Sequence, residues 1–453
     1  MGENFQIQLI EEKNLETTNT YILNRFVKPS QILDLVSQYG TPLYLIDENT
    51  LHLKANELLN AYGKYKGPKR IAYSVKANFT PSILRCFMKD GITFDLTSLG
   101  ELYFLKKCNI EPENAIYTSI TEEEEEYVQV LRNGITKVVV SSFNGMTNLV
   151  KAAIKTNIKP QTLIRINPEV NVQAEIRASY KNGKFGVPFN GGTIDSAFKI
   201  VKHILNNEFL NFDGLHFHLG SQITNFSCYS NTFSKLHGFI SKIKKEIPSI
   251  NISTLDIGGG TPVFYDQPVP TPKQMTENYI NKLNQLADDH GRFELIIESG
   301  RFLVAESSIL LSRIVNTKEY NGHKIVIVDA GYHVLLDSAL MKQEYPQEVI
   351  NIDNSDIYNI QSTLSSKNIH LAGRLCDTCD VFPQSRISNL NNASTGNYIS
   401  FYNVGAYSIV FNMPFHCQTK PPIVMKTSSG DLKLIRKGTT FENLFEEEGG
   451  YIL

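Results

Sequence analysis

The chain has 453 residues, of which 42% are hydrophobic and 20% charged, and its formal net charge at pH 7 is -2. This composition is typical of a globular protein with a large core and about two or three domains. The near-neutral charge argues against an electrostatic surface for nucleic acid or anionic membrane, and no apolar run approaches the ~18 residues of a membrane span. The first residues lack the basic and then apolar layout of a signal peptide, so we expect a cytoplasmic protein.

The six cysteines are scattered along the chain, which is not the pattern of a disulfide framework. Cys376 and Cys379 form one Cys-x-x-Cys pair. A zinc site of this type needs a second pair or a nearby histidine pair, and neither follows in the sequence. We therefore predict no metal.

The N-terminal part alternates short strand-like and helical patterns. Residues 5–10 and 43–46 are strand-like, whereas 29–38 and 48–65 have helical periodicity. Beyond them, eight strand-like runs alternate with helical stretches. The runs are 71–75, 92–95, 115–118, 137–140, 162–166, 214–218, 254–257 and 294–298.

Most of these eight runs are continuously apolar, as expected for parallel strands buried on both faces. Eight β/α units in about 250 residues match the size of a (β/α)₈ TIM barrel, which we assign to residues 41–310. A doubly wound open sheet is the alternative, although it usually has fewer strands. The acidic run from Thr121 to Glu126 is interpreted as a helix start, in which Thr121 caps the helix and Glu124 closes a capping box.

The pattern changes after about residue 310. The strand-like runs there are 309–316, 324–329, 369–371, 398–404 and 422–427. Gly, Asn, Ser and Asp separate them, and few good helices occur. We predict a second, mainly β domain formed by residues 1–40 and 311–453.

Nearly every barrel strand ends on a polar or glycine-rich element. These ends carry Lys76, Asp95, Ser141, Arg165, His218, Gly258 to Gly260, and Glu298 to Arg301. The active site of a β/α barrel forms at the carboxyl ends of its strands, so these groups converge on one mouth. Each could be a cap or a turn by itself, but together they indicate an enzyme.

Three glycine-containing elements are candidates for phosphate binding: Gly258 to Gly260, Gly300-Arg301 and Gly220-Ser221. Glycine lets the backbone approach a phosphate closely, although a tight turn uses it equally well. Lys76 ends an apolar strand, where a lysine that binds a carbonyl cofactor covalently needs to be. The combination favours pyridoxal phosphate over a dinucleotide, because no Gly-x-Gly-x-x-Gly follows an early strand.

Glu298 is a candidate partner for the ring nitrogen of such a cofactor. Its alternatives are a helix cap or a pair with Arg301. Strand alternation sends His216 and His218 in the same direction. One of the two is a candidate to stack on the ring, and for His216 we favour a core position.

Nine motifs in a consistent order, over roughly residues 40 to 425, carry a family resemblance. They are Tyr73-Ser-Val-Lys-Ala-Asn78, Phe94-Asp-Leu-Thr-Ser-Leu-Gly-Glu101, Arg165-Ile-Asn-Pro168, Lys184-Phe-Gly186, His218-Leu-Gly-Ser-Gln222, Asp256-Ile-Gly-Gly-Gly260, Glu298-Ser-Gly-Arg301, Cys376-Asp-Thr-Cys-Asp380 and Gly405-Ala-Tyr407. The chain resembles the pyridoxal-phosphate-dependent decarboxylases of the alanine-racemase fold (fold-type III). Within them it is most similar to the diaminopimelate decarboxylases.

The resemblance implies that Lys76 binds the cofactor covalently, that His218 stacks on its ring and that Glu298 binds its nitrogen. Asp95 and Arg165 are expected to line the ring. The phosphate is expected on Ser221, Gly258, Gly259, Gly260, Gly300, Arg301 and Tyr407. In the family, the residue matching Cys376 protonates the substrate carbon after CO₂ leaves and comes from the partner subunit. A homodimer with shared active sites follows from the resemblance.

The chain departs from the diaminopimelate decarboxylase pattern in the second domain. Asp337, Ser338 and Met341 occupy the positions of an Arg, a Pro and a Tyr, and the arginine normally holds the distal carboxylate of the substrate. Asp337 would repel such a carboxylate. Asp377 stands in place of a glutamate and suits a distal amine. We therefore predict α-decarboxylation of an amino acid, or of an intermediate derived from one, with altered distal-group specificity.

Three alternatives stay open. The chain could be a genuine diaminopimelate decarboxylase of lysine biosynthesis that binds the distal carboxylate through other basic groups such as Arg374. It could be a racemase on the same fold, which needs a second base facing Lys76. It could also be a non-catalytic protein that binds pyridoxal phosphate, although the Cys376 motif argues against this.

Overall fold

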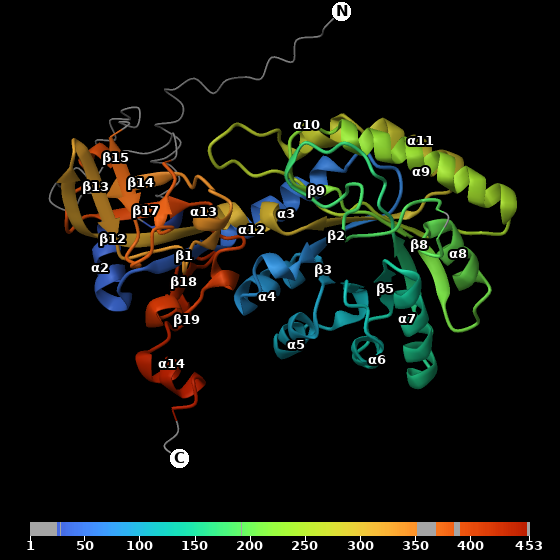
Figure 1. Ribbon diagram of the computed structural model, residues 1–453, viewed down its shortest axis with the longest axis horizontal. Helices are drawn as coiled ribbons and strands as arrows, with labels where there is room; N and C mark the ends of the chain where they lie inside the picture. Colours follow the sequence, from blue (N-terminus) through green and yellow to red (C-terminus); the bar gives the residue numbers. More distant parts are fainter. Residues whose placement is uncertain (1–24, 28, 192, 351–367, 385–389, 451–453) are drawn as a thin grey trace, which may run out of the picture. The chain divides into compact units, whose positions relative to one another are not determined.

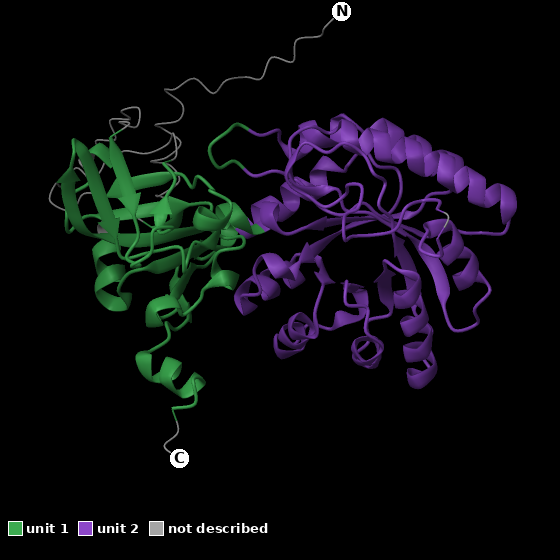
Figure 2. Ribbon diagram, viewed as in Figure 1, with its two compact units in different colours: residues 1–50, 264–268, 304–453 green, residues 51–263, 269–303 purple. Residues whose placement is uncertain are grey.

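The computed structural model describes residues 25–27, 29–191, 193–350, 368–384 and 390–450, and the predicted strand at 5–10 lies outside these ranges. The chain forms two compact units, shown in green and purple in Figure 2. Unit 1 comprises residues 1–50, 264–268 and 304–453, and unit 2 comprises 51–263 and 269–303. The chain passes from unit 1 into unit 2 within helix α3 (Glu48–Ala61).

Unit 2 is built on a closed barrel of eight parallel strands, in the order β10-β11-β2-β3-β4-β5-β6-β8. The strands are β2 (Lys69–Ser74), β3 (Thr93–Leu96), β4 (Ile116–Thr118), β5 (Lys137–Val140), β6 (Gln161–Arg165), β8 (Asn211–His216), β10 (Thr254–Asp256) and β11 (Glu294–Ser299). Each corresponds to one predicted run. The predicted TIM barrel is confirmed, and the open sheet is excluded because β10 pairs with both β8 and β11.

The barrel interior contains an apolar layer formed by five strands. It consists of the buried residues Ala72, Ile116, Val139, Leu163 and Ile296. Successive side chains of a strand point to opposite faces, so residues two positions further along face the same interior. Ser74, Arg165 and Glu298 therefore lie above this layer, at the carboxyl ends of their strands. Burial of such a layer contributes roughly 2 kcal/mol for each large aliphatic side chain.

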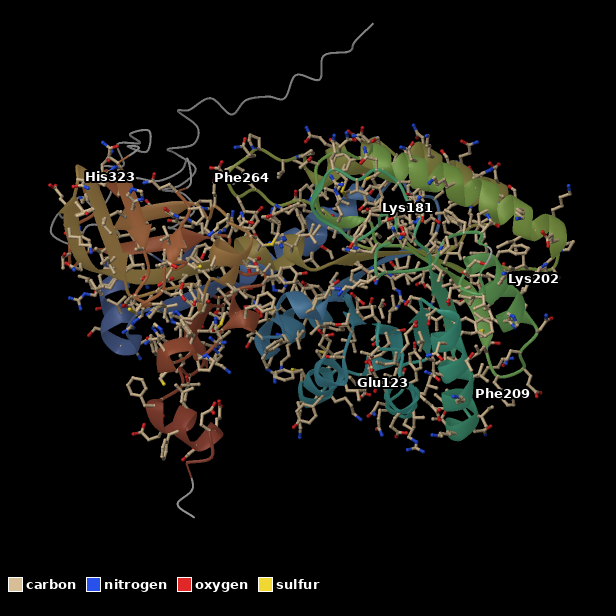
Figure 3. The ribbon with its side chains drawn as sticks, in the orientation of Figure 1. Glu123, Lys181, Lys202, Phe209, Phe264 and His323 are labelled. Carbon is tan, nitrogen blue, oxygen red and sulfur yellow. The ribbon has the colours of Figure 1, made fainter. Side chains whose placement is uncertain are left out.

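Helices form the outer layer of unit 2 (Figure 1). They are α4 (Pro81–Lys89), α5 (Leu99–Lys107), α6 (Glu124–Arg132), α7 (Phe143–Thr156), α8 (Ala197–Leu205), α9 (Ser227–Glu246), α10 (Pro272–Glu277) and α11 (Ile280–His290). In α4 the apolar positions Ile83, Leu84 and Phe87 are fully buried, as expected for an amphipathic helix. Lys202 on α8 belongs to this outer layer (Figure 3). In the described part of the chain, no helix has the length and hydropathy to cross a membrane.

The predicted capping box before α6 is wrong. The helix begins only at Glu124, and its N-cap residue Glu123 makes no side-chain cap. The Thr121 hydroxyl instead donates to Glu126 Oε2 at 2.6 Å. Glu123 is exposed (Figure 3), whereas Glu122 is buried and accepts hydrogen bonds from the next strand end. Among the five glutamates of this run Glu122 is the buried one, which the local pattern does not distinguish.

Unit 1 is built on a nine-stranded sheet, which confirms the predicted β domain. The strands are β1 (Leu43–Asp47), β12 (Ser308–Tyr320), β13 (His323–Val328), β14 (Gln347–Ile350), β15 (Ile369–Ala372), β16 (Val381–Phe382), β17 (Tyr398–Tyr402), β18 (Ile423–Lys426) and β19 (Leu432–Arg436). Its helices include α2 (Pro29–Tyr39), α13 (Leu336–Leu340) and α14 (Phe441–Glu447).

Unit 2 begins at residue 51 and ends at residue 303, ten and seven residues from the predicted boundaries at 41 and 310, and residues 264–268 also belong to unit 1. Strand β1 pairs antiparallel with β12, with Leu43 opposite Leu311 and Ile46 opposite Ser308. Leu43 and Leu311 lie in one hydrophobic cluster of unit 1. The strand at 43–46 therefore belongs to the β sheet and not to the barrel. A pairing over more than 260 positions leaves no local trace in the sequence.

Candidate active site

Lys76 lies just beyond β2, in a short 3-10 turn (Val75–Ala77) whose other two residues are buried. The turn is fixed at its end, because Tyr73 donates its hydroxyl to the carbonyl of Asn78 at 2.8 Å. The Lys76 side chain is 46% exposed, and its Nζ lies 3.7 Å from Asp95 Oδ2. Lys76 therefore presents a solvent-accessible amine on a backbone turn that is held in place by a hydrogen bond.

Asp95, on β3, is the buried partner of this amine and is 1% exposed. Its Oδ2 accepts a hydrogen bond from the Ser74 hydroxyl at 2.9 Å, whereas Oδ1 has no hydrogen-bond partner among the residues that the structure describes. Burial raises the pKa of Asp95, and Glu298 raises it further, while Lys76 and Ser74 act in the opposite direction.

Glu298 lies at the end of β11 and is 4% exposed. Its Oε1 is 3.1 Å from Nε2 of His216, which is fully buried. Burial raises the pKa of Glu298, and the positive charges of Lys76 and Arg165 oppose that rise. The Glu298 carboxylate is thus hydrogen-bonded to His216. This histidine is buried, as the sequence analysis favoured, but it also contacts a residue of the candidate site.

Arg165 ends β6 and is 8% exposed. Its guanidinium carbon lies 4.5 Å from the centre of the Phe185 ring. The loop that carries Phe185 is tied to the strand end, because Val187 N donates to Arg165 O at 3.0 Å. A Cβ at Gly186, whose φ is +69°, would lie within 3.0 Å of this backbone. The Lys184-Phe-Gly186 motif therefore covers the end of β6.

His218 is held in one tautomer by the glycine element. Gly259 N donates to His218 Nδ1 at 3.0 Å, so the neutral imidazole carries its proton on Nε2. Burial and then Arg165 lower the pKa of His218, which favours this neutral form. Gly258 has φ +63°, and a Cβ there would come within 2.4 Å of Phe217 O. The glycine is required by this close approach.

Ser221 and Arg301 are brought together, since Arg301 Nε donates to Ser221 Oγ at 3.4 Å. Ser221 lies on β9 (Gly220–Ile223), which pairs with β7 (Ala174–Arg177) in a two-stranded sheet that the sequence analysis missed. A Cβ at Gly300 would lie 2.9 Å from Ala77 Cβ, so this glycine lets the end of β11 approach the Lys76 turn.

The triple glycine is already engaged in part. Gly258 N donates to Asp256 Oδ1 at 2.9 Å, and Gly259 N donates to His218. These two amides therefore position side chains of the site, so a bound phosphate would have to share them. The sequence predicted all three amides as phosphate ligands, and that assignment remains a prediction.

Arg374, Cys376 and Asp377 lie in unit 1, between β15 and β16. Asp380 anchors this segment: its carboxylate accepts from Leu375 N at 2.7 Å and from Tyr332 N at 2.8 Å. A Cβ at Gly373 would come within 2.2 Å of that carboxylate. The Asp380 carboxylate occupies the space that a Cβ would need, which explains why a glycine precedes the cysteine motif.

The anchored segment presents a thiol and a carboxylate. Cys376 is exposed, and its N–H donates to His416 Nδ1 at 3.3 Å. Asp377 accepts from Cys379 N at 2.7 Å and from the Tyr332 hydroxyl at 3.3 Å. These hydrogen bonds lower the pKa of Asp377 and keep the carboxylate ionised, and the one from the Cys379 backbone N–H contributes most.

Asp337 and Tyr407 also belong to unit 1. Asp337 is 6% exposed in the first turn of α13. Tyr407 has φ +55°, and its ring is stacked on Phe411 with centroids 6.4 Å apart. The predicted residues thus fall into two sets, one from Lys76 to Arg301 in unit 2 and one from Asp337 to Tyr407 in unit 1.

The barrel site has the donors and acceptors that pyridoxal phosphate requires. A reachable lysine amine, a buried carboxylate and an Arg–Ser pair beside close-packed glycines would hold its aldehyde, its ring nitrogen and its phosphate. Three buried polar atoms of this site, Asp95 Oδ1, His216 Nδ1 and Asp256 Oδ2, have no hydrogen-bond partner within the described part of the chain. Such atoms are costly in a core and common in a site that awaits a ligand.

The comparison with protein families decides the identity of the chain. Residues 50–305, more than half of the sequence, match the pyridoxal-binding domain of the pyridoxal-dependent decarboxylases. The chain belongs to this family of decarboxylases. It is 28% identical to a diaminopimelate decarboxylase of Methanocaldococcus jannaschii, over 93% of this chain and 94% of that protein.

Solved structures of the pyridoxal-dependent decarboxylases agree. The diaminopimelate decarboxylase of M. jannaschii in complex with L-lysine has a TM-score of 0.81 and 27% identity, over 92% of this chain and 93% of that one. The Helicobacter pylori enzyme with L-lysine gives a TM-score of 0.80 and 25% identity, over 92% and 99%. The predicted family, the pyridoxal phosphate cofactor and the carboxy-lyase activity of a diaminopimelate-decarboxylase-like enzyme are confirmed.

Proposed function

We propose that this decarboxylase removes the α-carboxylate of an amino acid, or of an amino-acid-derived intermediate, that carries a distal amine and no distal carboxylate. We further propose that it works as a cytoplasmic homodimer with shared active sites. The observation that carries the substrate assignment is the fixed, ionised Asp377 next to Cys376.

The unit 2 residues account for the cofactor. When bound, pyridoxal phosphate supplies an electron sink for the electron pair left as CO₂ departs. Lys76 would hold the aldehyde carbon of the cofactor, and Asp95, 3.7 Å from the lysine amine, orients that amine. Glu298 would hydrogen-bond the ring nitrogen, and the neutral His218 would lie against the ring. Ser221 and Arg301 would bind the phosphate together with the backbone at Gly258 to Gly260 and at Gly300. Tyr407, from unit 1, is a further proposed phosphate ligand.

Cys376 is the proposed acid that returns a proton to the substrate α-carbon. Its Sγ is exposed, and the segment that carries it is fixed by Asp380. An exposed thiol on an anchored segment suits a residue that a subunit offers to its partner. Mixing Lys76→Ala and Cys376→Ala variants tests this, because hybrid dimers would contain one intact site and restore about 25% of the activity. Recovery near zero would contradict shared sites.

A distal ammonium group fits Asp377, which is ionised through its hydrogen bonds. Asp337 replaces an arginine of the related enzymes. It therefore places a second acidic side chain at a position where a distal carboxylate of the substrate would need a cation. Opposed like charges in a desolvated site cost on the order of several kcal/mol. The two aspartates together therefore favour amine-bearing substrates.

Diaminopimelate decarboxylation is the second candidate. The curated relatives at 28% and 26% identity are diaminopimelate decarboxylases, and the exposed Arg374 lies two residues before Cys376. Arginine binds carboxylates in a bidentate manner, so Arg374 is a candidate to bind the distal carboxylate in place of the arginine that Asp337 replaces.

The deciding experiment measures CO₂ release from meso-diaminopimelate, ornithine, lysine and carboxylated polyamine precursors. We expect kcat/KM to be at least about tenfold higher for a substrate with only a distal amine. Fast turnover of meso-diaminopimelate that Arg374→Gln abolishes would establish the second candidate instead. Asp377→Asn is the matched variant: it should raise KM for the amine substrates by about tenfold and leave diaminopimelate less affected. Inversion without CO₂ release would identify a racemase.

A further inference from the structure

Four interior residues on neighbouring strands form a layer of titratable side chains at the carboxyl ends of the barrel strands. In the strand register, Arg165 on β6 is opposite His216 on β8, and His216 is opposite Asp256 on β10. Asp256 is opposite Ile296 on β11, two positions before Glu298. The barrel therefore places a histidine and a second carboxyl directly beside the carboxylate proposed to bind the ring nitrogen.

His216 contacts Glu298 through one ring nitrogen, with Nε2 at 3.1 Å from Oε1. Their side chains are 0% and 5% exposed. One ring nitrogen of His216 and one carboxylate oxygen each of Asp256 and Glu298 lie within 4.8 Å of one another. This separation is close enough for a chain of hydrogen bonds after a small adjustment of the side chains.

The remaining polar atoms of the cluster fit such a chain. Among the described residues, His216 Nδ1 and Asp256 Oδ2 are buried without a hydrogen-bond partner, whereas Asp256 Oδ1 accepts from Gly258 N at 2.9 Å. Leaving a buried polar atom without a partner is unfavourable. These two atoms lie on adjacent strands, and each becomes the partner of the other if Asp256 carries a proton.

Burial supports that protonation. The charged groups around the cluster are the carboxyls of Asp95 and Glu298 and the cations Lys76, Arg165 and Arg70, and the second imidazole is that of His218. Burial and then Glu298 raise the pKa of Asp256 well above its usual value, while the Gly258 N–H and Arg70 oppose that rise. Burial and then Arg165 lower the pKa of His216, so this imidazole is neutral. We therefore take Asp256 as the carboxyl that carries a proton and acts as a hydrogen-bond donor.

We propose that His216 is a positioning residue for Glu298: its Nε2–H holds one carboxylate oxygen, while protonated Asp256 donates to Nδ1 and fixes this tautomer. The inference rests on the proposed role of Glu298 at the ring nitrogen. Without the His216 donor, Glu298 is a buried acid between two other acids and takes up a proton more easily. It then no longer stabilises a protonated ring nitrogen, and the electron sink is weakened.

The test compares His216→Leu with His216→Gln, because the glutamine amide can replace the Nε2–H donor and leucine cannot. Three quantities are measured on the full chain with pyridoxal phosphate: kcat with KM, the dissociation constant of the cofactor, and the pH titration of the bound cofactor's absorption. For His216→Leu we expect kcat to fall about 10–100-fold with little change in KM, and the absorption titration to shift. His216→Gln should recover most of both.

The matched control is His237→Leu, which removes a histidine–carboxylate pair of similar length on the outer helices. His237 Nε2 lies 3.0 Å from Asp289, but the two side chains are 43% and 45% exposed. This variant should leave the absorption titration unchanged. If His216→Leu fails to fold, Asp256→Leu provides the same readout, because it removes the donor to Nδ1, which an asparagine amide would retain, and should shift the titration in the same direction.

Two results would overturn the inference: wild-type kcat and absorption in His216→Leu, or a His216→Gln variant as impaired as the leucine one. Glu298→Gln separates the inference from the proposal on which it rests. If Glu298→Gln changes kcat and the absorption while His216→Leu does not, only the inference fails. If Glu298→Gln also changes neither, the assigned role of Glu298 fails as well.

Discussion

The barrel contains two charged clusters, one at each end of its strands, separated by the apolar layer. At the amino ends, Lys137 Nζ lies 2.9 Å from Asp213 and 3.3 Å from Glu294, and Arg70 lies 3.1 Å from Glu294. Each of these charges has an opposite charge beside it. At the carboxyl ends, Asp95 Oδ1, His216 Nδ1 and Asp256 Oδ2 have no hydrogen-bond partner among the described residues, and the pKa values of Asp95, Asp256 and Glu298 are raised.

The difference separates stability from function on the same eight strands. In the lower cluster each charge is paired with an opposite charge of the protein, so these charges contribute to folding and need no ligand. The upper cluster leaves polar groups buried, unpaired and out of their usual ionisation range, which folding alone does not favour. The proposed hydrogen bond between Asp256 and His216 satisfies part of it, and a bound molecule with matching groups completes the rest. Substitutions in the upper cluster should therefore change catalysis, and those in the lower one should change stability.

The largest expected effect is that of Lys76→Ala. Because the lysine binds the cofactor and positions the substrate amine, we expect kcat to fall by about 10⁴-fold or more. Absorption spectroscopy should show no lysine-bound cofactor, while the melting temperature stays within a few degrees of wild type. Lys66→Ala, at an exposed lysine paired with Asp288, is the control and should retain activity. A Lys76→Ala protein with wild-type absorption would refute the assignment.

Lys137→Met tests the lower cluster. This removes the cation between Asp213 and Glu294 and leaves two carboxylates close together, so the free energy of unfolding should fall by about 3 kcal/mol. Urea denaturation measures the loss. The kcat per folded molecule should not change, and a specific loss of kcat would contradict the division between the two clusters.

Glu348 provides a buried carboxyl outside the barrel, with the Tyr402 hydroxyl as its donor. Burial raises its pKa from the usual 4.5 to about 7. The folded chain binds this proton more tightly than the unfolded one, so the stabilisation is complete below pH 4.5 and is lost as the pH rises through 7. We expect Glu348→Gln to remove a pH-dependent term of about 1–3 kcal/mol between pH 5 and 8, measured by urea denaturation. An unchanged slope would show that this carboxyl is not perturbed.

Ser142→Ala should give the smallest change in stability of these variants, and it tests whether position near the upper cluster alone is enough to affect catalysis. Ser142 lies near the upper cluster, but its hydroxyl is fully used: it donates to Glu122 at 2.5 Å and accepts from Gly145 N at 2.8 Å at the start of α7. Loss of this N-cap should cost about 1 kcal/mol and leave kcat unchanged. Thermal unfolding and an activity assay distinguish this outcome from a catalytic role.

Much of the barrel was predictable, because strands buried on both faces are continuous apolar runs and their polar ends are easily located. Lys76, Asp95, Arg165 and Glu298 were found in this way. The pairing of β1 with β12 was not, since it joins residues far apart in the sequence. The short β7–β9 sheet was missed because a Gly-Ser sequence in β9 resembles a turn.

His216 and Asp256 show where sequence reasoning about the site falls short. Both sit on apolar strands, so each can be interpreted as a core residue. Their function depends on the register between β8 and β10, which places them opposite each other and beside Glu298. The strand alternation that puts His216 and His218 on one face was the only local signal, and it could not name the partner. Glu122 was hidden in the same way among four neighbouring glutamates.

The central claim is that Lys76 is the residue that binds pyridoxal phosphate. The most direct measurement treats the protein loaded with pyridoxal phosphate with borohydride, which makes a lysine-bound pyridoxal group permanent, and then maps the modified peptide by mass spectrometry. The account predicts a single modified residue, Lys76, and loss of the label when excess substrate is present before reduction. Modification of another lysine, or no stable label, would contradict it.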